Sequence, residues 1–480
     1  MRLFASAAVL LGSLVAFAGA PDLSVPFKVE ATENVSVDFP GAPRLQSFAW
    51  AQWEGKWIFI AGRTGGYHGV GQGDVDFPRA KSNQDIWVIE PPDSTGPAKV
   101  YSFPVSELPA SLNPLKDQWM STNLLHYQDK DTLYLAGGYG QNYAGDMVTF
   151  PIVSSVSLPA LVDGVIHHKD TFSKTIAWAE SPLVQSTGGA LLKLDDGFFY
   201  LIGGHVFTGS YRSFEAADEK TSPKASQTYL SEIRKLRLTQ TKPGKIEVTL
   251  VEAFKDPEFA RRDLNASVTI QPDGKSLGAA AYGGVFTKEQ LSFTHPVFIT
   301  AGAAPKPDET FEQKMSAYSC ATMLFFDPDS SAMYTTFFGG ISRWRWNDTA
   351  RKFEQAPTLG DKTKQTDYLD GMPWINEIST LVRGSGKTFE VVQQDSRLPG
   401  YLGTNAAFMP VAGLKKIRED ANIFDLRQFR GKRILAGYIY GGILASPKQF
   451  PYTDEAPEYT SGNVPTKPSD VILKVYVTAP

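Results

Sequence analysis

Short hydrophobic runs that end in glycine recur along the 480-residue chain. The clearest run, Leu133 to Ala136, stands directly before Gly137-Gly138. Four residues are too few for a helix, so the run predicts a buried strand, and glycine permits positive φ or a close neighbour at its end. Similar stretches occur at residues 57–62, 199–204, 278–284, 333–340 and 434–442. A strand repeated in this way indicates a repeat architecture.

The strands around each glycine-ended run predict an all-β propeller. In the first unit, strand patterns at residues 47–53, 57–62, 85–89 and 99–103 follow one another through turns, which is the strand content of one blade. The interval from Gly339 to Gly441 is almost twice the preceding one, and a hairpin pattern at 375–392 lies inside it. We therefore predict seven blades, the extra one without its glycine pair, with six blades as the alternative.

The two ends of the chain are expected to close the ring. The strand pattern at residues 29–37 has no partner of its own, and the last unit, which ends at 471–477, lacks a fourth strand. Because an open sheet edge invites aggregation, the N-terminal strand is expected to complete the last blade. Residues 21–480 would then form a single domain.

The composition and the N-terminus point to an exported protein. Hydrophobic residues make up 42% of the chain and charged residues 20%, and its 42 Gly and 32 Pro suit short strands joined by turns. Residues 1–20 read as a signal peptide, with Arg2, an apolar stretch, and a small-x-small cleavage site ending at Ala18 or Ala20. We expect a secreted or periplasmic monomer without a membrane span. The net charge of -4 gives no indication of the positive surface that a nucleic-acid-binding protein needs.

Cys320 is the only cysteine, so no intrachain disulfide is possible. It lies in a strand pattern, residues 319–326. We therefore expect a small, buried core residue and not a reactive thiol.

Strand pairs that end in Gly-Gly and lead into a further strand, such as 85–89 or 470–475, resemble kelch repeats. The unit at residues 338–357 is the most similar to that family. The resemblance covers nearly the whole chain after residue 20 and implies a kelch-type propeller. Such propellers include carbohydrate oxidases, sialic acid epimerases and protein-binding modules, so the fold alone does not select a function.

Loops that follow the glycine-ended strands leave a propeller on one rim, and three of them are long, at residues 64–84, 205–228 and 446–469. Loops of this length often carry function. They contain aromatic, arginine and histidine side chains suited to a sugar or a peptide, and Arg262 precedes an inner strand that can face the channel. The predicted ligand-binding residues are Arg63, Tyr67, His68, Arg79, His205, Tyr211, Arg212 and Arg262.

These residues favour a module that binds a carbohydrate or protein ligand. The alternative is a carbohydrate-active enzyme, similar to the sialic acid epimerases or mutarotases, that uses acid and base groups in the same place. Asp263 and Glu377 are candidates for such groups, although ion pairs explain them equally well. His68 and His205 lack an obvious third ligand, so we predict no metal and no cofactor.

Overall fold

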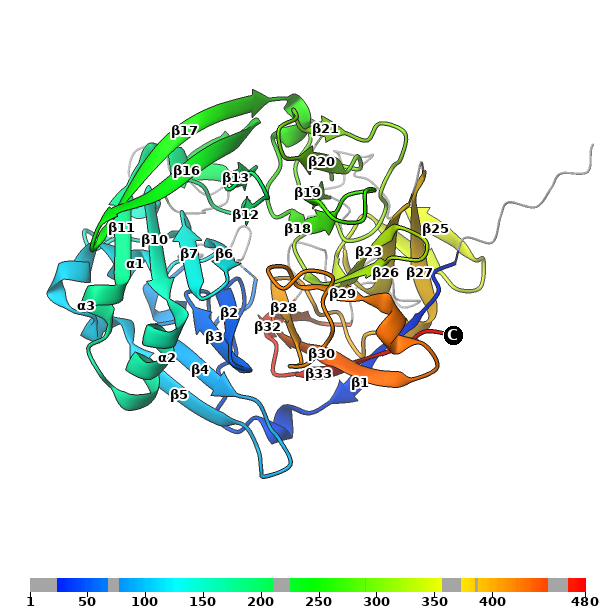
Figure 1. The fold of residues 1–480 in the computed structure, drawn as a ribbon, viewed down its shortest axis with the longest axis horizontal. Helices are drawn as coiled ribbons and strands as arrows, with labels where there is room; N and C mark the ends of the chain where they lie inside the picture. The colour runs from blue at the N-terminus through cyan, green and yellow to red at the C-terminus, as the bar shows by residue number, and fades with distance from the viewer. Residues whose placement is uncertain are drawn as a thin grey trace, which may run out of the picture.

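The computed structural model of the chain describes residues 24–67, 77–209, 225–289, 291–355, 373–384, 387–447 and 465–480. Within these ranges the fold is built almost entirely of small antiparallel sheets placed around a common centre (Figure 1), as in a β-propeller. The predicted signal peptide lies outside the described residues. No helix in the described ranges has the length and apolar character needed to cross a bilayer.

The first sheet contains four strands in sequence order. They are β2 (Ala49–Trp53), β3 (Lys56–Ile60), β4 (Asp85–Glu90) and β5 (Lys99–Pro104). The hairpin β2–β3 turns at Glu54-Gly55, where both residues have positive φ. These four strands match the first predicted unit.

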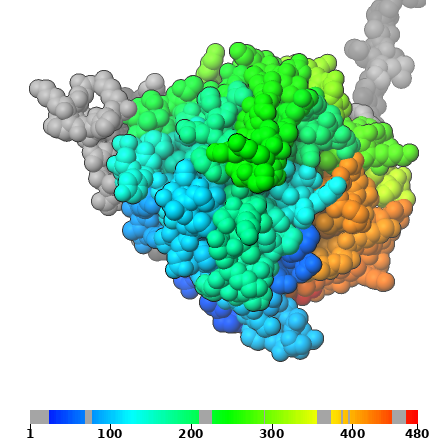
Figure 2. All heavy atoms as spheres, turned by 60° about the vertical axis from the view of Figure 1, so that its left-hand side comes forward, coloured from blue at the N-terminus to red at the C-terminus, as the bar shows by residue number. Residues whose placement is uncertain are grey.

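The next eight strands form one hydrogen-bonded sheet that consists of two groups of four. The first group is β6 (Leu125–Asp129), β7 (Thr132–Ala136), β10 (Ile152–Ser157) and β11 (Ile176–Glu180). The second group is β12 (Ala190–Lys193), β13 (Phe199–Ile202), β16 (Glu232–Lys242) and β17 (Lys245–Lys255). A parallel contact between Trp178 and Lys245 joins the groups. The long hairpin β16–β17 reaches the surface of the preceding group (green against cyan in Figure 2).

Two further sheets follow. One has the strands β18 (Asn265–Ile270), β19 (Leu277–Tyr282), β20 (Val297–Thr300) and β21 (Lys306–Pro307). The other has β22 (Ala321–Asp327), β23 (Ala332–Ile341), β26 (Trp374–Gly384), β27 (Lys387–Arg397) and, parallel to β22, β29 (Ile423–Asp425).

The pairing of β26 corrects the prediction of a separate seventh blade. The hairpin at residues 375–392 is β26–β27, and β26 pairs with the glycine-ended strand β23 from Met333↔Arg383 to Ile341↔Trp374. The hairpin therefore supplies the outer strands of the β22–β23 sheet. The hydrophobic pattern identified its strands, but it carries no information about which neighbour they bind.

The last sheet brings the two ends of the chain together. Its strands, in spatial order, are β1 (Lys28–Asn34), β33 (Leu473–Thr478), β30 (Arg433–Gly441) and β28 (Ala406–Pro410). The pairing of β1 with β33 is antiparallel and runs from Lys28↔Thr478 to Asn34↔Leu473. The strand pairing that the sequence predicted between the two ends is present, and β1 forms the edge of this sheet next to β33.

Three further sheets, built of shorter strands, lie beside the sheets described so far. The largest, which we call the rim sheet, consists of β8 (Tyr139–Gln141), β9 (Met147–Thr149), β14 (His205–Thr208) and β15 (Ser226–Tyr229). The other two are the hairpins β24 (Trp344–Asn347) with β25 (Lys352–Gln355), and β31 (Ile443–Ala445) with β32 (Thr466–Pro468). The strand pattern at residues 145–150 predicts a further blade strand, but Met147–Thr149 form β9 of the rim sheet instead.

Helices are few and short. The α-helices are α1 (Asn113–Gln118), α2 (Leu158–His167) and α3 (Phe172–Thr175). Single turns of 3-10 helix occur at η1 (Ser36–Asp38), η2 (Arg79–Lys81), η3 (Val105–Glu107), η4 (Ala110–Leu112), η5 (Pro182–Val184), η6 (Pro257–Phe259) and η7 (Leu426–Phe429). In α2, Leu158, Leu161, Val162 and Val165 are buried, which is the spacing of one helix face.

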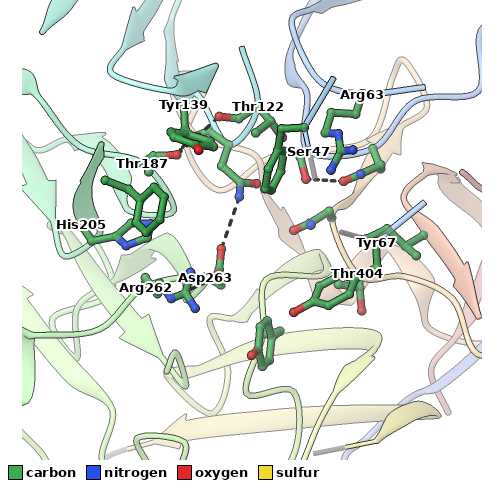
Figure 3. Close-up of a pocket in the computed structure, with 17 residues that line it drawn as sticks. Ser47, Arg63, Tyr67, Thr122, Tyr139, Thr187, His205, Arg262, Asp263 and Thr404 are labelled. Atoms are coloured by element: carbon green, nitrogen blue, oxygen red, sulfur yellow. Dashed lines mark hydrogen bonds and ion pairs between the residues drawn. The ribbon is translucent and has the colours of Figure 1, made fainter. Parts of the chain in front are cut away.

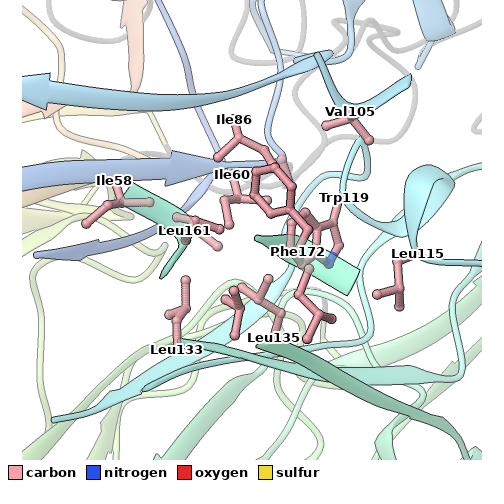
Figure 4. Packing of buried hydrophobic residues seen from close by; sticks show 14 of the residues in the cluster. Ile58, Ile60, Ile86, Val105, Leu115, Trp119, Leu133, Leu135, Leu161 and Phe172 are labelled. Carbon is pink, nitrogen blue, oxygen red and sulfur yellow. The ribbon is translucent and has the colours of Figure 1, made fainter. Parts of the chain in front are cut away.

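The buried face of α2 belongs to a core shared by neighbouring sheets. Ile58 and Ile60 of β3 and Leu133 and Leu135 of β7 meet there, with Leu161 from the helix (Figure 4). All five side chains are fully buried. Apolar contacts therefore hold the sheet of β3 against that of β7, with α2 between them. Cys320 is buried too, as predicted, and burial raises the pKa of its thiol to about 12.

Candidate functional site

A closed cycle of backbone hydrogen bonds surrounds the centre of the fold. Six residues take part, one from each unit of strands. The backbone N–H of each residue donates to the carbonyl oxygen of the one before it in sequence, with N–O distances of 2.5 to 3.4 Å, and the N–H of the first donates to the carbonyl of the last, which closes the cycle. One member stands immediately before or near the start of each innermost strand. We call these residues the collar: Ser47, Asn123, Gly188, Asp263, Ser319 and Asn405.

The residue types of the collar follow from its backbone. Asn123, Asp263 and Asn405 have φ of 51°, 51° and 54°, and Gly188 has φ of 68°. Asn and Asp tolerate this left-handed region better than other side chains, and Gly occupies it freely. Ser47 shares this conformation, at φ of 55°, without being one of these residue types. Four of the five left-handed collar positions therefore carry residues that suit their conformation, and three of those four add a polar side chain at the centre.

A cavity lies on one side of the collar and encloses about 620 Å³ of protein-free space, part of it open to solvent. Two sets of repeated positions line it, as Figure 3 shows. The first set directly precedes the collar in sequence and comprises Gln46, Thr122, Thr187, Arg262, Tyr318 and Thr404. The second set directly follows a glycine at a strand end and comprises Arg63, Tyr139, His205 and Ile443.

Short bridges hold the two sets together. Gln46 pairs with Arg63, Thr122 with Tyr139, and Thr187 with His205. The glycines make this approach possible, because a Cβ on Gly204 would lie 2.1 Å from Ser186 Oγ. In four units the repeated strand ending thus places the side chain after the glycine at the cavity.

A second cavity, with about 380 Å³ of protein-free space, is lined by collar residues and by the residues that follow them. Ser47, Asn123 and Asp263 line both cavities. The polar collar therefore lies between two hollows along the centre of the fold.

His205 begins β14 and is 4% exposed. Burial, and secondarily the positive charge of Arg262, hold the pKa of His205 well below its ordinary value. At neutral pH the imidazole is therefore uncharged.

Arg262 and Asp263 lie next to each other at the junction of the cavities. Arg262 Nε is 3.7 Å from Asp263 Oδ2, and Asn123 Nδ2 donates to Asp263 Oδ1 at 3.5 Å. Burial raises the pKa of Asp263, and the charge of Arg262 opposes that rise. Arg63 contributes a second guanidinium, which lies 4.3 Å from the ring centre of Phe77.

The structure brings together four of the eight predicted ligand-binding residues. Arg63, Tyr67, His205 and Arg262 all line the first cavity. Arg79 does not: it pairs with Asp117 at 2.8 Å and donates to the carbonyl of Gln141, because η2 turns it toward α1 and β8. His68, Tyr211 and Arg212 lie outside the described residues.

Sequence reasoning missed several lining residues, above all Tyr139, Phe77, Phe207 and Thr404. Tyr139 carried a usable signal, since it directly follows the glycine pair in the clearest repeat. Thr404 and the other residues before the collar had no such mark, since only the pairing of strands places them together.

Among the residues that the structure describes, the site offers hydrogen-bond donors, aromatic faces and one carboxyl group, that of Asp263. Among the described residues, no group of three or more His, Cys, Asp or Glu side chains is arranged to hold a metal ion. Side chains of this kind suit a polar molecule with acceptor oxygens, held against aromatic rings.

No family model matches the chain, and no curated protein sequence matches it. Matches to solved structures number 190 chains. One of them, the structure of YjhT, has 11% sequence identity and a TM-score of 0.43, over 90% of this chain and 99% of that one.

Proposed function

We propose that the chain is a kelch-type propeller of six four-stranded units, closed where β1 pairs with β33. The six-membered collar supports six units, because each collar residue belongs to a different one. The antiparallel register of β1 on β33 supports closure by the N-terminal strand. This proposal takes the six-blade alternative.

We further propose that the protein is exported and binds a carbohydrate in the first cavity. The observation that carries the proposal is the convergence of Arg63, Tyr67, His205 and Arg262 on one hollow lined by aromatic rings. Aromatic faces stack on sugar rings, and guanidinium groups donate to their oxygens. A concave site favours a small molecule over a protein partner, which would need a broad surface.

The charged side chains that line the first cavity indicate which class of sugar it would bind. Arg63 and Arg262 bring two positive charges to the cavity, whereas Asp263 is its one acidic side chain among the described residues and its pKa is raised. We propose a sugar that carries a carboxylate, because guanidinium pairs with carboxylate through strong charge-assisted hydrogen bonds.

The second candidate function is a sugar isomerase in the same cavity. It is favoured by the Asp263 carboxyl, whose side chain is 15% exposed, because the burial that raises its pKa brings it closer to the range needed for proton transfer. The protein would then exchange anomers or epimers of the sugar that it binds.

Binding and turnover can be tested together by NMR with D-glucose and D-glucuronate. We expect saturable shifts with D-glucuronate, and binding about tenfold weaker or worse when Arg63→Gln or Arg262→Gln removes a charged donor. Arg79→Gln is the matched control, since Arg79 lies outside the cavity lining. Exchange between anomers that disappears in Asp263→Asn would favour the enzyme.

Absence of binding to either sugar, together with a protein captured through the same face, would favour the protein-binding alternative. Export has a separate test, which is the mass of the native protein after expression in a host that secretes it. We expect the chain to begin at Gly19 or Pro21.

A further inference from the structure

The surroundings of His205 fix its ring on one face of the rim sheet. In the pairing of β14 with β15, His205 lies opposite Tyr229, and Phe207 lies opposite Gln227. These four side chains share one face because residues two apart on a strand point the same way. The His205 ring centre is 5.9 Å from that of Phe207 and 5.8 Å from that of Tyr229. Contact with these two rings restricts the rotation of the imidazole.

The fourth member of this face, Gln227, binds the ring through a nitrogen. Its side-chain Nε2 lies 2.6 Å from His205 Nδ1. With its amide nitrogen toward the ring, Gln227 donates to Nδ1, which then accepts and carries no proton. The buried ring beside Arg262 is neutral at pH 7 and holds one proton. That proton is therefore on Nε2.

We propose that Gln227 is a positioning residue that holds His205 as the Nε2–H tautomer, so that the ring offers the first cavity a hydrogen-bond donor and not a base. Nδ1 is occupied by Gln227, which leaves Nε2 for a molecule in the cavity that His205 lines. This inference rests on the proposed function and deepens it: the bound sugar presents an acceptor oxygen, from a hydroxyl, carbonyl or carboxylate, to His205.

The tautomer also assigns roles within the site. A neutral imidazole that carries its proton on Nε2 cannot remove a proton from a molecule there. Should the protein isomerise sugars, the proton-accepting group would have to be another side chain of the cavity, and Asp263 is the carboxyl that lines it. His205 would stabilise negative charge on oxygen.

Long-range ¹H–¹⁵N spectra of protein labelled in histidine test the inference, with the His205 signals assigned from a His205→Gln variant. We expect the Nε2–H pattern in the native protein. In Gln227→Glu, a carboxylate of nearly the same shape replaces the amide donor. It should accept a proton from Nδ1, switch the tautomer and raise the pKa of His205.

Thr228→Val is the matched control, because Thr228 is exposed on β15 and its side chain points to the opposite face from Gln227. It should leave the His205 spectrum unchanged. An Nδ1–H pattern in the native protein, or a tautomer that Gln227→Glu does not alter, would overturn the inference.

Titration with D-glucuronate separates this inference from the proposed function. We expect Gln227→Glu to weaken binding about tenfold, because the acceptor oxygen of the sugar loses its donor. An Nε2–H ring in a protein that binds no sugar would leave the tautomer standing and refute the sugar site. Sugar binding by a protein with an Nδ1–H ring would refute the proposed tautomer and leave the sugar site in place.

Discussion

Phe27 provides the sharpest test of closure by the N-terminal strand. Its side chain is 5% exposed and packs against the sheet next to the one that β1 joins. The ring meets Phe325 at 5.2 Å and 62°, and Tyr334 at 5.4 Å and 82°, both edge-on. Phe27 therefore ties β1 to a neighbouring sheet, whereas the β1–β33 hydrogen bonds tie it to the last sheet.

The expected cost of Phe27→Ala is about 4 kcal/mol in the free energy of unfolding. Replacing a buried Phe by Ala typically costs about 3–5 kcal/mol, and two edge-to-face contacts, each worth about 0.5–1.5 kcal/mol, are lost with it. We place the value in the middle of the range because Phe27 lies near the chain terminus, where the site can relax more easily than in a central sheet.

Denaturant unfolding measures the free energy, and hydrogen exchange of the amides in β33 reports whether β1 has separated. Val37→Ala is the control, since Val37 is 87% exposed and should change stability by less than about 0.5 kcal/mol. A cost below about 1 kcal/mol for Phe27→Ala, with unchanged protection of β33, would refute the reasoning.

Three further predictions concern the strand endings, one ion pair and the cavity. Gly137→Ala should destabilise the protein by at least about 2 kcal/mol more than Gly197→Ala in thermal or urea unfolding: both glycines have positive φ, but only at Gly137 would a Cβ approach a backbone oxygen, at 1.9 Å. Asp425→Asn should cost about 2 kcal/mol at pH 7. Because the bonds from Arg427 lower the pKa of Asp425 to about 2, below its unfolded value, that contribution is present above about pH 4 and should fade in unfolding curves taken from pH 5 down to pH 2. Thr404→Val should leave stability equal or higher, since Thr404 Oγ1 has no hydrogen-bond partner among the described residues; D-glucuronate binding measured by calorimetry should nevertheless weaken, and unchanged binding would exclude that hydroxyl from the site.

The sequence by itself determined many of the strands and the pairing of the two chain ends. Alternating and continuous apolar runs are local signals, so β3, β7, β13 and β19 were predicted, each with its terminal glycine. The shortage of one strand at each end predicted the partnership of β1 and β33. Arg63 and His205 could be predicted as site residues from the sequence, because a residue that directly follows a strand end has a defined place on the rim.

Only the tertiary structure decided which strands are neighbours. A pattern states that a segment is extended but not which edge it pairs with, so residues 375–392 joined β23 instead of forming a blade, and β9 entered the rim sheet. The cavity depends on the same long-range contacts. Thr122, Thr187 and Thr404 are far apart in sequence and unremarkable one at a time, and they line one hollow because hydrogen bonds between units set the collar beneath them.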